Sequence, residues 1–315
     1  MECLICNYIN VSPYNYLYDN RYGYPGIFQI TKCPKCGHKT FQKKFTPEEI
    51  MRLYSEYYPR STFDLDQFKP YKETSGFYAW LNGDYNSAFR WVPRNVRVLD
   101  IGCGFGESLG YHRSRGCDVY GVEADENIQR VADKFGYKVH VGLFDPNLYE
   151  HDFFDYVTMD QVIEHIANPI QTLREIAQVI KPGGILVLGT PNANGWGARI
   201  FGNRWVHWHI PYHLHLFSKE SMRSAATQTG FVVDYSKTIT SSYWLHMQWC
   251  HLLTCPKMGE PSEFWSPKRK QRSTTKAIIK SLYLLDILKI NHMLSRIFDA
   301  LDLGDNYLFI LRKKP

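Results

Sequence analysis

The stretch VRVLDIGCGFGES, residues 96–108, predicts a strand, a glycine-rich loop and the start of a helix. Its first half is apolar, as in a strand that is buried on both faces. The loop glycines allow a sharp turn and a close approach of the backbone to a ligand; they are Gly102, Gly104 and Gly106. A dinucleotide-binding loop would have glycine or alanine at position 107, but Glu107 stands there and would repel a pyrophosphate. The stretch therefore predicts a ligand loop that is not specific for a dinucleotide.

The next predicted strand, CDVYGVEAD, ends in Glu123, about 20 residues after the first loop glycine. A carboxylate at this place can accept hydrogen bonds from both ribose hydroxyls of a nucleoside. From Val96 onward, short apolar runs alternate with helical patterns, which is typical of a parallel sheet covered on both faces. A glycine loop and a ribose acceptor without a phosphate site fit the chemistry of S-adenosylmethionine.

These segments resemble the motifs of class I S-adenosylmethionine-dependent methyltransferases. VLDIGCGFG is similar to the first motif of that family, and VEAD to its acidic second strand. Further similar segments reach the C-terminus, at residues 153–169, 181–192, 230–234 and 305–313. The resemblance implies an α/β fold with a Rossmann-like, seven-stranded methyltransferase sheet, an antiparallel last strand, and S-adenosylmethionine as methyl donor.

The resemblance also implies cofactor contacts. Asp100 and the three loop glycines would surround the methionine portion, and Glu123 would hold the ribose. Leu143 departs from the family pattern, because many relatives carry aspartate at its position. The remaining expected contacts are Phe144 in the adenine pocket, Asp145 as acceptor for the adenine amino group, and Asp160 and Gln161 at the end of the fourth strand.

Two cysteine pairs near the N-terminus, Cys3-x-x-Cys6 and Cys33-x-x-Cys36, predict a metal site. Each pair can present two thiolates from a tight turn, and four thiolates form the tetrahedral site that structural zinc prefers. Disulfides are the alternative, which the lack of a visible signal peptide disfavours. We expect all four cysteines to bind Zn²⁺, with His38 outside the ligand set.

The chain divides into three predicted units: a zinc-binding module at 1–45, a helical connector at 46–94 and a methyltransferase domain at 95–315. Thr46 before Pro47 is a favourable helix start. A helical insertion is expected at 245–300. It would pack against the domain, form a lid, form a dimer contact, or contact a membrane surface near the basic run 268–272. Its apolar face would consist of Ile278, Leu282, Leu285, Leu294, Ile297 and Leu301.

Composition narrows the class of protein. The net charge of +6 is mild, and no apolar run has membrane-spanning length because Asp286 and Lys289 interrupt the best candidate. We therefore expect a cytoplasmic protein. The aromatic content of 15% fits a core plus a ring-lined cleft.

The stretch RWVHWHIPYHLHLFS, residues 204–218, is rich in histidines that suit a metal cage, a ring-lined pocket or a crowded core. We favour the pocket, because no carboxylate accompanies the histidines; the crowded core remains a good interpretation for His207 and His209. Alternation predicts that Leu214 and Leu216 face the core, and that the cleft is faced by His213, His215 and Phe217. Ser218 is expected to cap a helix that Gly230 ends.

The same stretch resembles the P-x-H-L…F-S segment of zinc-module methyltransferases that modify sugars and polysaccharides. This implies a hydroxyl acceptor on a sugar, nucleotide-sugar or glycan. Since a hydroxyl must lose its proton during attack, we expect His213 as the base, with His165 as the second candidate. Glu164 either orients His165 or is an acidic residue at a helix start.

Two other functions remain as alternatives. One is an RNA methyltransferase, which is disfavoured because the fourth strand lacks the N/D-P-P-Y/F signature and the zinc module has few basic residues. The other is a non-catalytic scaffold, which the intact glycine loop and Glu123 disfavour. We therefore expect a small-molecule partner and no nucleic acid.

Overall fold

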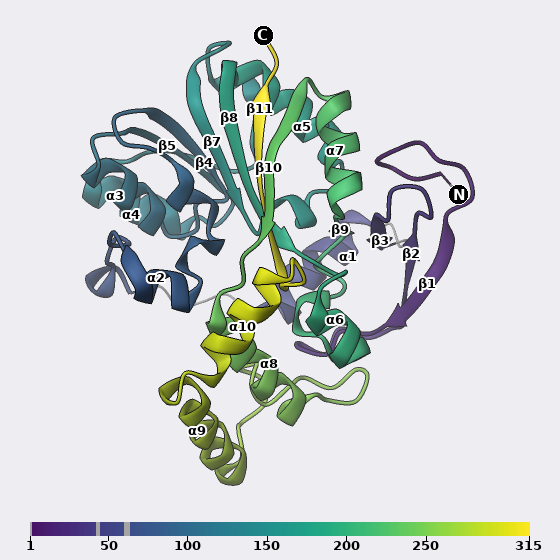
Figure 1. Cartoon of the computed structure of the whole chain (residues 1–315). Coiled ribbons are helices and arrows are strands. Elements are labelled where there is room, and N and C mark those ends of the chain that lie inside the picture. Colours follow the sequence, from purple (N-terminus) through teal and green to yellow (C-terminus); the bar gives the residue numbers. More distant parts are fainter. Residues whose placement is uncertain (1, 42–44, 60–63) are drawn as a thin grey trace.

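The computed structural model describes residues 2–41, 45–59 and 64–315. This part of the chain folds around a seven-stranded sheet with the order β10-β11-β8-β7-β4-β5-β6 (Figure 1). The strands are β4 (Arg97–Ile101), β5 (Asp118–Glu123), β6 (Lys138–Val141), β7 (Phe154–Asp160), β8 (Ile180–Pro191), β10 (Phe231–Thr238) and β11 (Asn306–Lys313). Strand β11 is antiparallel to β8 and β10, whereas the pairs β4–β5, β4–β7, β5–β6 and β7–β8 are parallel. The expected Rossmann-like sheet with an antiparallel last strand is confirmed.

Helices cover both faces of this sheet (Figure 1). Both faces of the sheet are apolar, as β4 illustrates, because its side chains alternate between two hydrophobic clusters. Val98 packs in one cluster with Leu109, whereas Leu99 and Ile101 pack in the other with Leu173. Each fully buried aliphatic side chain of this kind stabilises the fold by roughly 1.5–3 kcal/mol. The helices concerned are α3 (Glu107–Ser114) and α4 (Asn127–Phe135) on one face, and α5 (Pro169–Val179) and α7 (Lys219–Gln228) on the other.

The N-terminal module is built into the domain. Its strands are β1 (Ser12–Leu17), β2 (Phe28–Lys32) and β3 (Lys39–Phe41), and β3 pairs with β9 (His215–Leu216) of the histidine-rich stretch. Ser218 Oγ donates a hydrogen bond to the Cys36 carbonyl at 2.5 Å, and Phe217 shares a hydrophobic cluster with Cys3. A sheet of this size cannot bury enough apolar surface alone. The described residues of this module therefore share one core with the domain.

Two helix starts follow the expected capping chemistry. Helix α1 (Pro47–Arg52) begins at Thr46, whose Oγ1 accepts the Glu49 N–H at 3.2 Å. Helix α7 begins at Ser218, whose Oγ accepts the Ser221 N–H at 3.0 Å. After α7, Gly230 adopts a φ of +84°, a left-handed conformation that favours glycine. The connector continues with α2 (Gly76–Asn82) and short 3₁₀ turns.

Three helices lie between β10 and β11, below the sheet in Figure 1: α8 (Ser242–Thr254), α9 (Ser273–Ile287) and α10 (Ile290–Ala300). The expected packed apolar face is wrong for Ile278, Ile297 and Leu301, whose exposed fractions are 46%, 52% and 62%. Polar side chains of α10 occupy the buried positions instead. No helix in the described part of the chain combines the length and the apolarity that a membrane span needs. A further helix, α6 (Trp196–Phe201), follows β8.

Candidate functional site

The expected cofactor residues converge at the carboxyl edge of the sheet. Asp100 lies on β4, Glu123 ends β5, Phe144 follows β6 and Asp160 ends β7. Strands β5 and β6 lie on one side of β4, and β7 lies on the other. The loops after β4 and β7 therefore diverge, which is the arrangement that binds ligands in open α/β sheets.

The glycine loop and the acid at the end of β5 contact each other directly. Glu123 Oε2 accepts the N–H of Gly104 at 2.9 Å, and Glu123 Oε1 accepts the N–H of Asp125 at 2.9 Å. Gly104 has a φ of +57°, and a Cβ added there would meet no atom of the described residues within 4 Å. At Gly102, by contrast, an added Cβ would lie 2.4 Å from Val162 Cγ2. The loop is therefore tightly packed on its inner side and open at Gly104, as a ligand requires.

Asp100 lies beneath this loop, with 5% of its surface exposed. Its Oδ1 accepts the Thr158 hydroxyl at 2.6 Å, and its Oδ2 accepts the Ser108 hydroxyl. Burial raises the pKa of Asp100 to about 6. Both carboxylate oxygens are thus bonded within the protein, so the side chain fixes β7 and the start of α3. That Asp100 also lies beside the methionine portion of the cofactor stays a prediction.

The loop after β6 carries the expected adenine residues. The Phe144 ring stacks on Tyr149 with a centroid distance of 6.3 Å. Asp145 Oδ1 accepts both the backbone and the side-chain N–H of Asn147, at 2.9 and 2.8 Å. Leu143 is 82% exposed. The loop therefore presents one ring and one apolar side chain, while one oxygen of Asp145 is already occupied.

The end of β7 has an unusual backbone conformation. Gln161 has a φ of +57°, in the left-handed region that favours glycine. It is held there because its N–H donates to Gly189 O at 2.8 Å and its Nε2 donates to Asn306 Oδ1 at 2.8 Å. Such residues cost of order 1–3 kcal/mol and cluster at functional sites. Burial, followed by the charge of Asp100, raises the pKa of neighbouring Asp160 to about 7.

Two histidines lie together just beyond the cofactor edge. Centroids of the His165 and His213 rings are 4.7 Å apart. His165 Nδ1 lies 3.0 Å from the Tyr212 carbonyl, and His213 Nδ1 lies 2.9 Å from the His207 carbonyl. Because a carbonyl only accepts, each Nδ1 carries the hydrogen and each Nε2 keeps a lone pair. Burial lowers the pKa of His165 to about 4 and holds the pKa of His213 well below its usual value, so both rings are neutral.

The Glu164 side chain lies beside these two histidines. It is fully buried, and its Oε2 accepts the Thr190 hydroxyl at 3.1 Å. Among the described residues, Glu164 Oε1 has no hydrogen-bond partner, and burial raises the pKa of the carboxyl to about 8. The ligand atoms of Glu164, His165 and His213 lie within 4.8 Å of one another. The expectation that no carboxylate accompanies the histidines is therefore wrong, and this group could hold a metal ion, since both imidazoles donate their other N–H to a carbonyl.

The expected role of Glu164 and the orientation of His215 also differ from the structure. Thr190, and no histidine, donates the hydrogen bond to Glu164, whereas the Tyr212 carbonyl orients His165. His215 Nδ1 lies 3.1 Å from His38 Nε2, at the contact with the N-terminal module. Leu214 and Leu216 pack in a cluster with Phe28 and Ile30 of the same module, so the N-terminal module contacts both faces of the alternating stretch.

Rings from three parts of the chain line this region. Tyr22 and Tyr58 lie 5.5 and 5.1 Å from the Tyr212 ring, and Tyr22 lies 5.7 Å from His209. Within the described residues, the buried Tyr212 hydroxyl and His209 Nε2 have no hydrogen-bond partner. His207 is also buried, and its ring contacts Trp244. The histidine-rich stretch is therefore packed like a core and contains polar atoms that need a partner.

Arg21 is a site residue that the sequence did not reveal. It is 5% exposed, and its Nη2 donates to the Val206 carbonyl at 2.5 Å. Its guanidinium lies 4.2 Å from the centre of the Trp265 ring, and its charge contributes to lowering the pKa values of His165 and His213. The only signal in the sequence is that several tyrosines stand within a few residues of Arg21, which could have indicated a ring-lined site there.

The four N-terminal cysteines converge as expected. Cys3 Sγ lies 3.7 Å from Cys36 Sγ, and Cys6 Sγ lies 3.6 Å from Cys33 Sγ. All four sulfurs lie within 4.8 Å of one another, and all are free thiols. Four sulfurs bonded to one zinc ion at about 2.3 Å would be about 3.8 Å apart. The cluster therefore has the size of a tetrahedral metal site and not the short contact of a disulfide.

Comparison with known proteins agrees with this architecture. The family model described as a methyltransferase domain matches residues 59–236, more than half of the chain. The chain therefore belongs to the methyltransferase family, and its fold is that of the class I S-adenosylmethionine-dependent enzymes.

Curated relatives include ubiquinone biosynthesis O-methyltransferases. That of Maricaulis maris (strain MCS10) is 36% identical over 149 residues, which cover 43% of this chain and 58% of the relative. That of Azoarcus sp. (strain BH72) is 30% identical over 156 residues, covering 47% and 64%. The chain thus matches between half and two thirds of the length of these relatives.

The solved structures that match this chain share less sequence with it. An S-adenosylmethionine-dependent methyltransferase from Archaeoglobus fulgidus is 19% identical, with a TM-score of 0.43 over 72% of this chain and 88% of that one. Phosphoethanolamine N-methyltransferase 2 of Haemonchus contortus, in complex with S-adenosyl-L-methionine, is 21% identical, with a TM-score of 0.46 over 72% and 50%.

Proposed function

We propose that this methyltransferase transfers a methyl group to a hydroxyl oxygen of a small, ring-shaped acceptor in the histidine- and tyrosine-lined region. The observation that carries the proposal is that three of the buried polar atoms without a partner among the described residues belong to this region: Glu164 Oε1, His209 Nε2 and the Tyr212 hydroxyl. Buried polar groups are nearly always paired, so these atoms are suited to bind the polar groups of an acceptor. The names of the curated relatives, which are O-methyltransferases, support oxygen as the acceptor atom.

The residues at the carboxyl edge fit S-adenosylmethionine, which supplies an electrophilic methyl group when bound. Glu123 would hold the ribose, and Gly104 would let the backbone approach the ligand closely. Phe144 and Leu143 would cover the adenine. The protein's remaining task is to align the acceptor oxygen and to remove its proton.

His213 and His165 are the candidates for the base. Each has a neutral ring with a free Nε2 lone pair, and each is fixed by the carbonyl that its Nδ1 contacts. The proton of the acceptor hydroxyl would pass to one of these Nε2 atoms as the oxygen attacks. Glu164, when protonated, can donate a hydrogen bond to the same acceptor.

The acceptor class is tested by a direct assay. Labelled S-adenosylmethionine should be offered with nucleotide sugars, with dihydroxyphenols and with RNA, and the product atom identified by mass spectrometry. We expect methyl transfer to an oxygen of a ring-shaped small molecule. The sequence motif with Pro211, His213 and Phe217 favours a sugar as the acceptor. The names of the curated relatives favour a phenol. Transfer to RNA, or cofactor binding without any transfer, would contradict the proposal.

We also propose that Cys3, Cys6, Cys33 and Cys36 bind Zn²⁺. The sulfur–sulfur distances of 3.6 and 3.7 Å support this, because they match the edges of a tetrahedral zinc site. Four sulfur ligands leave no open position, so the role is structural. Metal analysis of protein purified under reducing conditions should find one zinc ion for each chain.

A further inference from the structure

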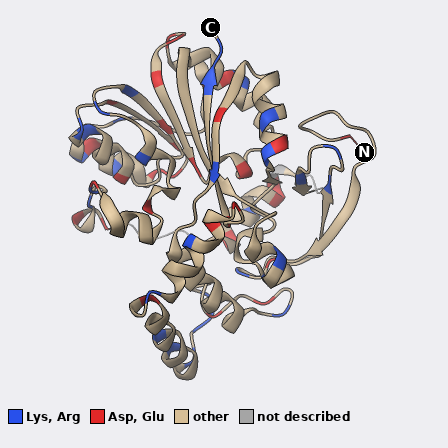
Figure 2. Cartoon of the chain, viewed as in Figure 1, with Lys and Arg blue, Asp and Glu red and all other residues tan. Residues whose placement is uncertain are grey.

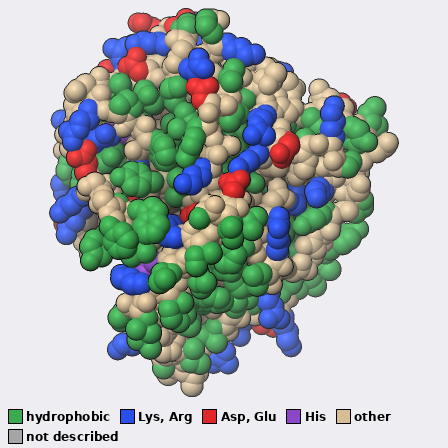
Figure 3. All heavy atoms as spheres, in the orientation of Figure 1, with side chains coloured by type: hydrophobic (Ala, Val, Ile, Leu, Met, Phe, Trp, Pro, Cys, Tyr) green, Lys and Arg blue, Asp and Glu red, His purple; other side chains and the backbone are tan. Residues whose placement is uncertain are grey.

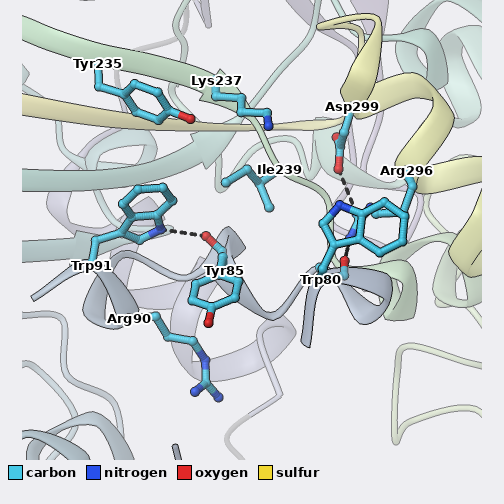
Figure 4. Close-up of a pocket in the computed structure, with 10 residues that line it drawn as sticks. Trp80, Tyr85, Arg90, Trp91, Tyr235, Lys237, Ile239, Arg296 and Asp299 are labelled. Atoms are coloured by element: carbon cyan, nitrogen blue, oxygen red, sulfur yellow. Dashed lines mark hydrogen bonds and ion pairs between the residues drawn. The ribbon is translucent and has the colours of Figure 1, made fainter. Parts of the chain in front are cut away.

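Helix α10 turns its polar side toward the protein. Asn291 is fully buried, and Arg296 and Asp299 are each 7% exposed. Arg296 donates to the Trp80 carbonyl on α2 at 2.6 Å and to Asp299 Oδ2 at 2.7 Å (Figure 4). Asp299 also accepts the Thr240 N–H at 2.8 Å, at the end of β10. This polar network fixes the rotation of α10, and it forces the opposite side of the helix into solvent.

The exposed side of α10 is apolar and continues onto α9. We call this surface the outer helical face; it consists of Tyr283, Leu284, Ile287, Leu288, Ile290, Met293, Ile297 and Leu301, which are 40–70% exposed. Helix α2 lies beside α10, and it adds Phe77, Tyr78 and Trp80, which are 54–70% exposed. In Figure 3, hydrophobic side chains cover much of the lower part of the molecule, where these helices lie. Contiguous apolar surface of this kind marks an interaction site.

Most of the charged side chains on this surface are positive. Lys276, Lys280 and Lys289 are exposed, and none has a carboxylate partner among the described residues (Figure 2). Both carboxylates of α9 and α10 are already paired, Asp286 with His246 at 2.8 Å and Asp299 with Arg296. Lysines without a carboxylate partner therefore outnumber carboxylates on the described part of the outer helical face.

The lysines of α9 lie on the same side as its apolar residues. Lys276, Lys280, Tyr283 and Ile287 are spaced by three or four residues, so they form one stripe along the helix. A lysine beside apolar side chains can bury its aliphatic stem while its ammonium group reaches lipid headgroups. Lysines beside exposed apolar side chains on one stripe of a helix suit contact with a membrane surface.

We propose that the outer helical face docks on an anionic phospholipid surface. A second copy of the chain would bring like charges together, whereas anionic headgroups complement the lysines. The basic run that the sequence emphasised contributes less, because Arg269 and Arg272 pair with Glu260 and Glu263 at 3.1 and 2.7 Å. The proposal is independent of the acceptor's identity.

Sedimentation of the full chain with vesicles tests this proposal. We expect binding to vesicles of phosphatidylcholine mixed with phosphatidylglycerol, weak binding to phosphatidylcholine alone, and release at high salt. Ile287→Asp should abolish most of the binding, because Ile287 is 70% exposed and would place a carboxylate among the lipids. Lys280→Gln should weaken binding about five-fold, the typical effect of one basic residue near an anionic surface.

Ile27→Asp is the matched control, since Ile27 is 63% exposed on the N-terminal module. It should bind vesicles like the wild type, and cofactor binding by each variant should confirm that it is folded. Failure of the wild type to bind anionic vesicles would overturn the proposal. A dimer in light scattering that Ile287→Asp dissociates, without vesicle binding, would also overturn it and would assign the face to a second copy.

Discussion

Replacing Glu123 by alanine tests the centre of the proposed cofactor site. The carboxylate accepts the N–H groups of Gly104 and Asp125, each at 2.9 Å, and it would accept the ribose hydroxyls. A hydrogen bond to a charged group contributes about 1.5–3 kcal/mol. Glu123→Ala should therefore raise the dissociation constant of S-adenosylmethionine about ten- to hundred-fold, as measured by calorimetry.

An analogue of the cofactor without ribose hydroxyls separates a direct contact from support of the loop. Wild-type protein should bind this analogue more weakly than the cofactor, whereas Glu123→Ala should bind both about equally. If Glu123→Ala weakens binding of the cofactor and of the analogue by the same factor, Glu123 only supports the loop, and the assignment to the ribose is refuted.

Three other perturbations test the site and its supports. Chelation of zinc should lower the rate of methyl transfer more than the cofactor affinity. The reason is that β3 of the N-terminal module pairs with the histidine-rich stretch and not with the glycine loop. Equal losses in the two assays would contradict this prediction. His213→Ala should lower the turnover number roughly 10²- to 10⁴-fold with unchanged cofactor affinity. The wild-type rate should show no step near pH 6.5, since burial lowers the pKa values of His213 and His165. If His213→Ala keeps its full turnover number, His165→Ala becomes the decisive variant. Burial raises the pKa of Asp100 from 3.8 to about 6, so this carboxyl ionises in the unfolded chain before it ionises in the folded protein as the pH rises. The free energy of unfolding should therefore fall by up to about 3 kcal/mol between pH 4 and 6. Denaturant unfolding of Asp100→Asn should lack this part of the pH dependence.

Local sequence determined the fold and the residues of the candidate cofactor site. The alternation of apolar strands with helices, the glycines at 102, 104 and 106, and the caps Thr46 and Ser218 depend on interactions within a few residues. Glu123 was also identifiable, because the carboxyl ends of neighbouring parallel strands must meet at one edge. The cysteine spacing predicted a four-sulfur cluster for the same reason, since each pair lies within one turn.

Only the tertiary structure decided the contacts between segments that are distant in the chain. Glu164 meets His213 because the loops after β7 and β8 lie side by side, as the 2.8 Å bond from the Leu214 N–H to the Glu164 carbonyl shows. The N-terminal module became part of the domain core through the pairing of β3 with β9.

The insertion shows most clearly why sequence pattern was insufficient. Helical spacing predicted that Ile297 and Leu301 pack inward, because the burial of apolar surface is usually the main driving force of folding. Arg296 and Asp299 lie on the other side of the same helix, and a charged pair that bonds to Trp80 and Thr240 holds that side inward. The helical period fixes which residues share a face, but the partners of that face lie far away in the chain, so only the folded structure determines which face is buried.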